Sequence, residues 1–105
     1  MAAPIDRRSL ILSANRALLG EISSAVRAVF VREDGNDVHI QFIMDGPISD
    51  EDYSSISIVG SEMAADFPMH RVKESGVRLD APMPVPRTEG WHTVFARREK
   101  ESGSG

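Results

Sequence analysis

The sequence has no cysteine among its 105 residues, which excludes disulfide bonds and metal sites built on cysteine ligands. Its apolar runs are far shorter than the roughly 20 residues that a membrane-spanning helix needs. The first residues carry two arginines but no apolar stretch followed by a cleavage site, so we expect no signal peptide. A net charge of −4 argues against direct binding of nucleic acid. These absences favour a small cytoplasmic protein without a membrane segment.

Lysine and arginine are completely missing between Glu33 and Asp66. The 32 residues before this stretch carry five arginines and two acids, and the 39 residues after it carry seven basic residues and five acids. Acidic residues often do no more than cover a solvated surface, but the missing counter-charges favour patches that attract basic proteins. The stretch holds nine acids: Glu33, Asp34, Asp37, Asp45, Asp50, Glu51, Asp52, Glu62 and Asp66.

The first third of the chain shows the spacing of one helix and two strands. Apolar residues at helical spacing predict a helix that is capped by Asp6 or Ser9 and ends at about Leu19, before Gly20. Strands are predicted over 25–32 and 37–44, with a tight turn at 33–36 where Asp-Gly favours a positive φ. Alternation in the first strand places Val26, Ala28 and Phe30 on one side, and Arg27, Val29 and Val31 on the other.

A second helix is predicted from Ser49, its N-cap, to about Asp66, because Pro68 cannot continue it. The first turn is acidic, as the helix dipole favours. Residues 69–80 and 91–97 are predicted to be extended, and the prolines between them exclude a helix. The buried stripe of the second helix is expected to comprise Tyr53, Ile56, Val59, Gly60, Met63 and Phe67, with Ile48 and Tyr53 forming a hydrophobic staple.

These elements predict an α+β protein with the order helix, strand, strand, helix, strand, strand. We expect a two-layer sandwich in which a mostly antiparallel sheet of three or four strands carries both helices on one face. The other face would be partly open and show Arg27, His39 and Gln41. Residues 1–101 would form a single domain, and 102–105 (Ser-Gly-Ser-Gly) a linker or cloning scar.

No catalytic constellation is visible in the sequence. The three histidines fall in different predicted elements without ligand-spaced neighbours, so we expect no metal site and no cofactor. No Gly-x-Ser-x-Gly elbow surrounds any serine, and helix capping explains the consecutive acids Asp50, Glu51 and Asp52. We therefore predict that the protein is not an enzyme.

Several strings resemble a group of small bacterial immunity proteins of contact-dependent growth inhibition and related polymorphic toxin systems. They are Asn15-Arg16-Ala17-Leu18-Leu19-Gly20, Arg27-Ala28-Val29-Phe30-Val31, Phe42 to Asp45-Gly46, Ile48-Ser49-Asp50-Glu51-Asp52, Asp66-Phe67-Pro68 and Arg78-Leu79-Asp80-Ala81-Pro82. The resemblance covers nearly all of residues 10 to 97. It implies a cytoplasmic inhibitor that binds one cognate toxin domain, and such toxins are often nucleases with basic clefts.

An acidic surface is a suitable partner for a basic cleft, since complementary charge raises the association rate and buried anchors supply affinity. The candidate partner-binding residues are Asp45, Asp50, Glu51, Asp52, Tyr53, Glu62 and Trp91. Burial of Tyr53 in the core would remove it from this set. Two alternatives stay open: a small homodimeric regulatory or structural domain that pairs through a strand edge or the open sheet face, and an enzyme with a pocket that the sequence does not reveal.

Overall fold

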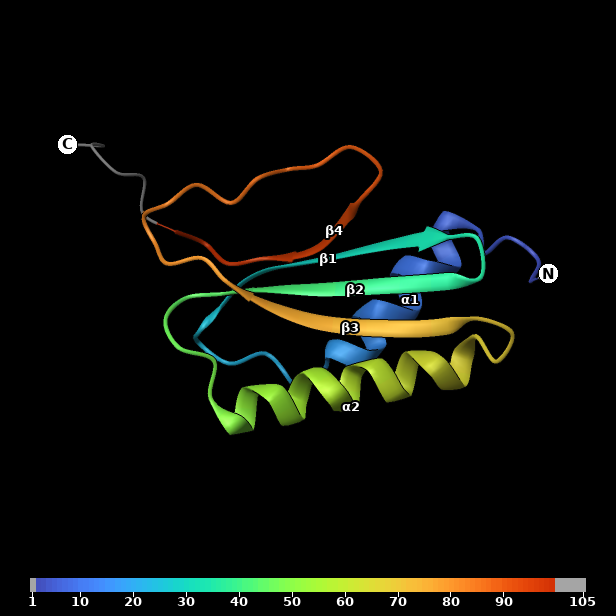
Figure 1. Cartoon of the computed structure of the whole chain (residues 1–105), viewed down its shortest axis with the longest axis horizontal. Helices are drawn as coiled ribbons and strands as arrows, with labels where there is room; N and C mark the ends of the chain where they lie inside the picture. Colours follow the sequence, from blue (N-terminus) through green and yellow to red (C-terminus); the bar gives the residue numbers. More distant parts are fainter. Residues whose placement is uncertain (1, 100–105) are drawn as a thin grey trace.

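The computed structural model describes residues 2–99, so the predicted domain end at 101 and linker at 102–105 lie outside the described residues. The predicted element order is confirmed, and the strand predicted over 37–44 has those bounds. Within the described part, no helix is long and apolar enough to cross a membrane. The elements are α1 (Arg7–Leu18), β1 (Val26–Asp34), β2 (Asp37–Met44), α2 (Asp50–Asp66), β3 (Arg71–Arg78) and β4 (His92–Ala96) (Figure 1).

The four strands form one sheet in the order β3-β2-β1-β4. The expectation of a mostly antiparallel sheet is wrong, because β3 pairs with β2 in parallel and the sheet is mixed. The reason is the length of α2, which has 17 residues. A helix of that length spans about 25 Å, close to the roughly 26 Å of an eight-residue strand. It therefore returns the chain to the end of the sheet at which β2 began.

Both helices pack on one face of the sheet, as predicted; in Figure 1, α1 lies behind the strands and α2 below them. A capping side chain fixes the start of each helix: Asp6 accepts a hydrogen bond from the Ser9 N–H at 2.7 Å, and Ser49 accepts one from the Asp52 N–H at 3.0 Å. The main core is formed by Leu10, Ala14, Ala17, Leu18, Val26, Val29, Val31, Val38, Ile40, Phe42, Met44, Ile56, Val59 and Met63.

The predicted facing of β1 is wrong at its start. The β1–β2 register shifts between Val26 and Ala28, so that Arg27 is an extra residue on β1. Val26 consequently faces the helices, while Ala28 and Phe30 lie in a second cluster with Ile43 on the opposite face. A single inserted residue reverses the face on which the residues before it lie relative to those after it. The alternation of apolar and polar residues alone does not reveal such an insertion.

The face opposite the helices is less open than predicted. The long β3–β4 connection, which loops out beside β4 in Figure 1, packs Leu79, Val85 and Trp91 against the second cluster on this face. Arg27 was expected to be displayed here but is only 3% exposed. Its guanidinium donates to both carboxylate oxygens of Glu99, at 2.7 and 2.8 Å, and to the Leu79 carbonyl at 2.7 Å. These bonds fasten the connection and residue 99 to β1.

Candidate partner-binding surface

Ion pairing divides the nine acids of the 33–66 stretch into two groups. Five of them pair with a basic residue or histidine that lies outside the stretch: Glu33 with His70, Asp34 with Arg32, Asp37 with Arg71 and Lys73, Asp45 with Arg97, and Asp66 with Arg16. Within residues 2–99, the other four form no ion pair: Asp50, Glu51, Asp52 and Glu62. All four belong to α2, a helix without lysine or arginine.

The Asp45 side chain forms hydrogen bonds within the protein. Its carboxylate accepts hydrogen bonds from Arg97 at 2.9 Å and from the Ala81 N–H at 3.2 Å. These bonds, with Arg97 the larger influence, hold the pKa of Asp45 below its ordinary value. The carboxylate joins the end of β2 to the β3–β4 connection and the residues after β4, so we leave Asp45 out of the candidate surface.

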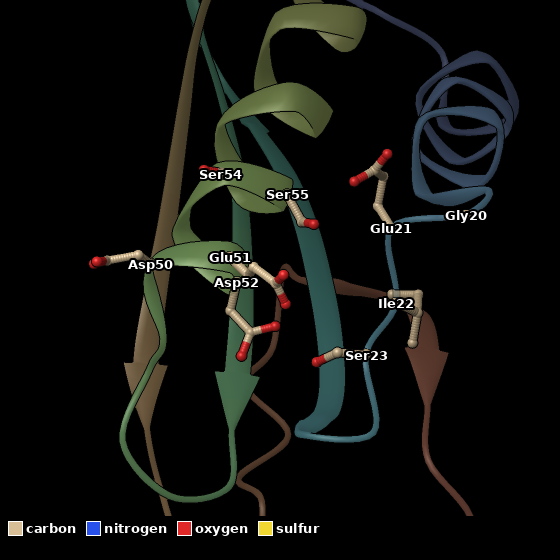
Figure 2. Close-up of a pocket in the computed structure, with 9 residues that line it drawn as sticks. All are labelled: Gly20, Glu21, Ile22, Ser23, Asp50, Glu51, Asp52, Ser54 and Ser55. Atoms are coloured by element: carbon tan, nitrogen blue, oxygen red, sulfur yellow. The ribbon is translucent and has the colours of Figure 1, made fainter.

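The first turn of α2 borders a cleft of about 500 Å³. The opposite wall is the loop between α1 and β1, residues 20–23. Figure 2 shows Glu51 and Asp52 directed toward this loop and the Glu21 carboxylate directed toward α2, whereas Asp50 points away from the cleft. Three carboxylates therefore surround one concave site. Sequence reasoning missed Glu21, because only the docking of the two segments brings it to α2.

Two apolar side chains on α2 are also exposed to solvent. Tyr53 is 52% exposed and Ile58 is 44% exposed. The prediction that Tyr53 belongs to the buried stripe is wrong, whereas Ile56, Val59, Gly60 and Met63 are buried as expected. Tyr53 thus stays a candidate anchor. The same helix offers both uncompensated negative charge and exposed apolar area.

Trp91 lies elsewhere. It packs in the cluster on the opposite face of the sheet, with the Arg32 guanidinium 5.3 Å from its ring centroid and the His39 ring 6.2 Å away. The structure therefore brings together Asp50, Glu51, Asp52, Tyr53 and Glu62 on one helix and separates Trp91 from them. Among residues 2–99, no group of three histidine, aspartate or glutamate side chains could hold a metal ion.

Comparison with known protein families shows which family the chain belongs to, which its geometry alone does not reveal. The family model described as MafI2 immunity protein matches residues 7–99, which include every helix and strand of the structure. The chain belongs to the MafI2 immunity protein family. No curated protein matches the chain. Membership confirms the resemblance to bacterial immunity proteins of polymorphic toxin systems, and an immunity protein of this kind acts against a toxin.

Proposed function

We propose that this protein neutralises its cognate toxin by direct binding, and that the outward surface of α2 is the contact. The observation that carries this proposal is the pairing pattern of the acids. Within the stretch from Glu33 to Asp66, five acids pair with a basic residue or histidine, whereas Asp50, Glu51, Asp52 and Glu62 on α2 have no ion-pair partner within residues 2–99. These four carboxylates on one helix are therefore available to an external cation.

The toxin that best fits such a surface has a basic cleft, as a nuclease does, and we propose a nuclease domain as the partner. Complementary charge steers the encounter and can raise the association rate by orders of magnitude at low salt. Tyr53 and Ile58 add apolar area that leaves water on binding, and aromatic anchors of this kind commonly dominate interface energies. We place this encounter in the cytoplasm of the bacterium that makes the immunity protein, as in contact-dependent growth inhibition.

A capture experiment followed by kinetics with purified components tests the proposal. The tagged protein is incubated with lysate and secreted fractions of the source bacterium, and a captured toxin domain is identified by mass spectrometry and purified. Binding is then compared for the parent, for Glu51→Lys/Glu62→Lys, and for the matched control Asp34→Lys/Glu89→Lys. The control changes the net charge equally at exposed positions outside α2. We expect the α2 variant to associate at least about tenfold more slowly at low salt and the control to resemble the parent.

Each other outcome has a definite meaning. Equal association of the two double variants would remove α2 as the contact and keep toxin neutralisation. Failure to capture any toxin, together with a mass that rises with concentration, would favour the homodimeric regulatory or structural alternative.

A further inference from the structure

The outer edge of β3 is a regular sheet edge without a neighbouring strand. β3 is the last strand on its side of the sheet and pairs with β2 over all eight residues without a register shift. Six of its eight residues are exposed. The opposite edge, β4, has five residues, and its register with β1 shifts between Val29 and Phe30. β3 is therefore the edge better suited to accept a further strand.

The hydrogen bonds at the two ends of β3 show which of its backbone groups are free. The Arg71 N–H donates to the Asn36 carbonyl and the Leu79 N–H to the Met44 carbonyl, each at 2.8 Å. In a parallel ladder, alternate residues of a strand bond to the same neighbour. The odd-numbered residues between 71 and 79 therefore bond to β2. The N–H and C=O groups of Val72, Glu74, Gly76 and Arg78 point away from the sheet.

One stripe of α2 lies beside this edge. Gly60 is so close to β3 that a methyl group in its place would meet the Glu74 side chain. Tyr53, Ser57 and Ala64 share this stripe by helical spacing, and all three are exposed. Small residues thus leave room next to the edge. Glu74, which forms no ion pair within residues 2–99, adds a further uncompensated carboxylate near α2.

We propose that the β3 edge takes up an extended segment of the toxin as a fifth strand, with basic side chains at alternate positions directed toward Glu74 and α2. This inference rests on the proposed function and specifies its mode of binding. Strand addition of this kind supplies affinity through backbone hydrogen bonds and specificity through alternate side chains.

Charge decides between the toxin and a second copy of this chain as the occupant. If β3 paired with itself across a two-fold axis, the same faces of the two sheets would coincide. The two α2 helices and the two Glu74 side chains would then lie on the same side, near one another. The basic residues of β3 are already paired, Arg71 and Lys73 with Asp37 and Arg78 with Asp80, so the unpaired acids would repel across the junction. A basic strand from another protein turns the same carboxylates into attractive partners.

Residue-resolved amide hydrogen exchange, measured by NMR with the purified toxin domain from the capture experiment, tests this inference. In the free protein, we expect slow exchange at Lys73, Ser75 and Val77, whose N–H groups bond to β2, and fast exchange at Glu74 and Gly76. Added toxin is expected to slow Glu74 and Gly76 at least about tenfold, with the odd-numbered residues of the same strand as internal reference.

Two variants separate the backbone from the side chain at the centre of this edge. Glu74→Pro removes an outward N–H without removing a bond to β2, and proline is tolerated on edge strands. Glu74→Ala removes only the carboxylate. We expect Glu74→Pro to weaken toxin binding at least about tenfold beyond Glu74→Ala, with circular dichroism confirming that both variants fold.

The outcomes distinguish failure of the inference from failure of the proposed function. Unchanged exchange at Glu74 and Gly76, in a complex that is still weakened by Glu51→Lys/Glu62→Lys, would refute strand addition and keep the proposed function. Slowing that appears without toxin and increases with protein concentration would mean self-pairing and would overturn the choice of occupant. Absence of any toxin binding would remove both.

Discussion

Replacement of Glu99 by alanine should destabilise the protein more than replacement of its partner, Arg27. The two side chains form a pair in which only one member is deeply buried: Arg27 is 3% exposed, whereas Glu99 lies near the surface. Loss of Glu99 leaves a buried guanidinium with only the Leu79 carbonyl as hydrogen-bond partner. Loss of Arg27 leaves a carboxylate that water can solvate.

The expected magnitudes follow from this difference in burial. Removal of one partner of a fully buried pair costs about 3–5 kcal/mol. Glu99 is partly exposed, so we expect about 2–3 kcal/mol for Glu99→Ala. Arg27→Met keeps most of the buried volume and leaves the Leu79 carbonyl without its donor, for a cost of about 1–2 kcal/mol. The double variant should be about as stable as Arg27→Met, because without Arg27 there is no buried guanidinium for the loss of Glu99 to leave unpaired.

Urea denaturation near neutral pH, followed by far-UV circular dichroism, measures the free energies of unfolding. The fluorescence of Trp91, the single tryptophan, reports separately on the β3–β4 connection that packs around it. For a domain of this size, about 2–3 kcal/mol corresponds to a fall of roughly 10–20 °C in Tm. If Arg27→Met were the more destabilising change, or if the double variant were additive, the account of Arg27 as a buried charge held by Glu99 would be wrong.

Three further predictions concern acid, the core and a helix cap. Arg27, with Arg97, lowers the pKa of Glu99 from 4.5 to about 2. The stabilisation by Glu99 should therefore be complete above about pH 4.5 and disappear as the pH falls toward 2. Urea titrations at several pH values should show that the Glu99→Ala variant lacks this loss of stability in acid. Phe42→Ala, at a side chain 1% exposed, should cost about 3–5 kcal/mol by the same titration. Ser49→Ala should cost about 1 kcal/mol and reduce helicity at the start of α2, and Ser49→Asp, which keeps an acceptor, should retain stability.

Those parts of the fold that depend on neighbouring residues could be predicted from the sequence. Alternation identified β2 with its observed bounds, and Ser49 and Pro68 marked the ends of α2. The parallel pairing of β3 was missed because it follows from a comparison of the lengths of α2 and the strands, not from any local pattern. The facing of β1 was missed because the extra residue at Arg27 has no sequence signature.

The candidate surface, too, could be predicted only in those features that are local in the sequence. The sequence located the excess of acid and the acidic first turn of α2, both of which are visible in the order of residues. It could not show that Arg97 neutralises Asp45, since the two residues meet only in the folded chain. It also could not bring Glu21 to the same cleft as Glu51 or place Trp91 on the opposite face of the sheet.

The strand order has a consequence for synthesis of the chain on the ribosome. Among the elements of residues 2–99, β1 precedes its partner β4 by the whole of β2, α2 and β3, so one edge of β1 has no neighbour until Val29 can pair with Phe95. Most residues of β1 are apolar, and an unpaired apolar edge is a site of aggregation for a nascent chain. Synthesis of β4, rather than formation of the β1–β2 hairpin, should therefore be the step that closes this exposed edge and protects the chain from misassembly.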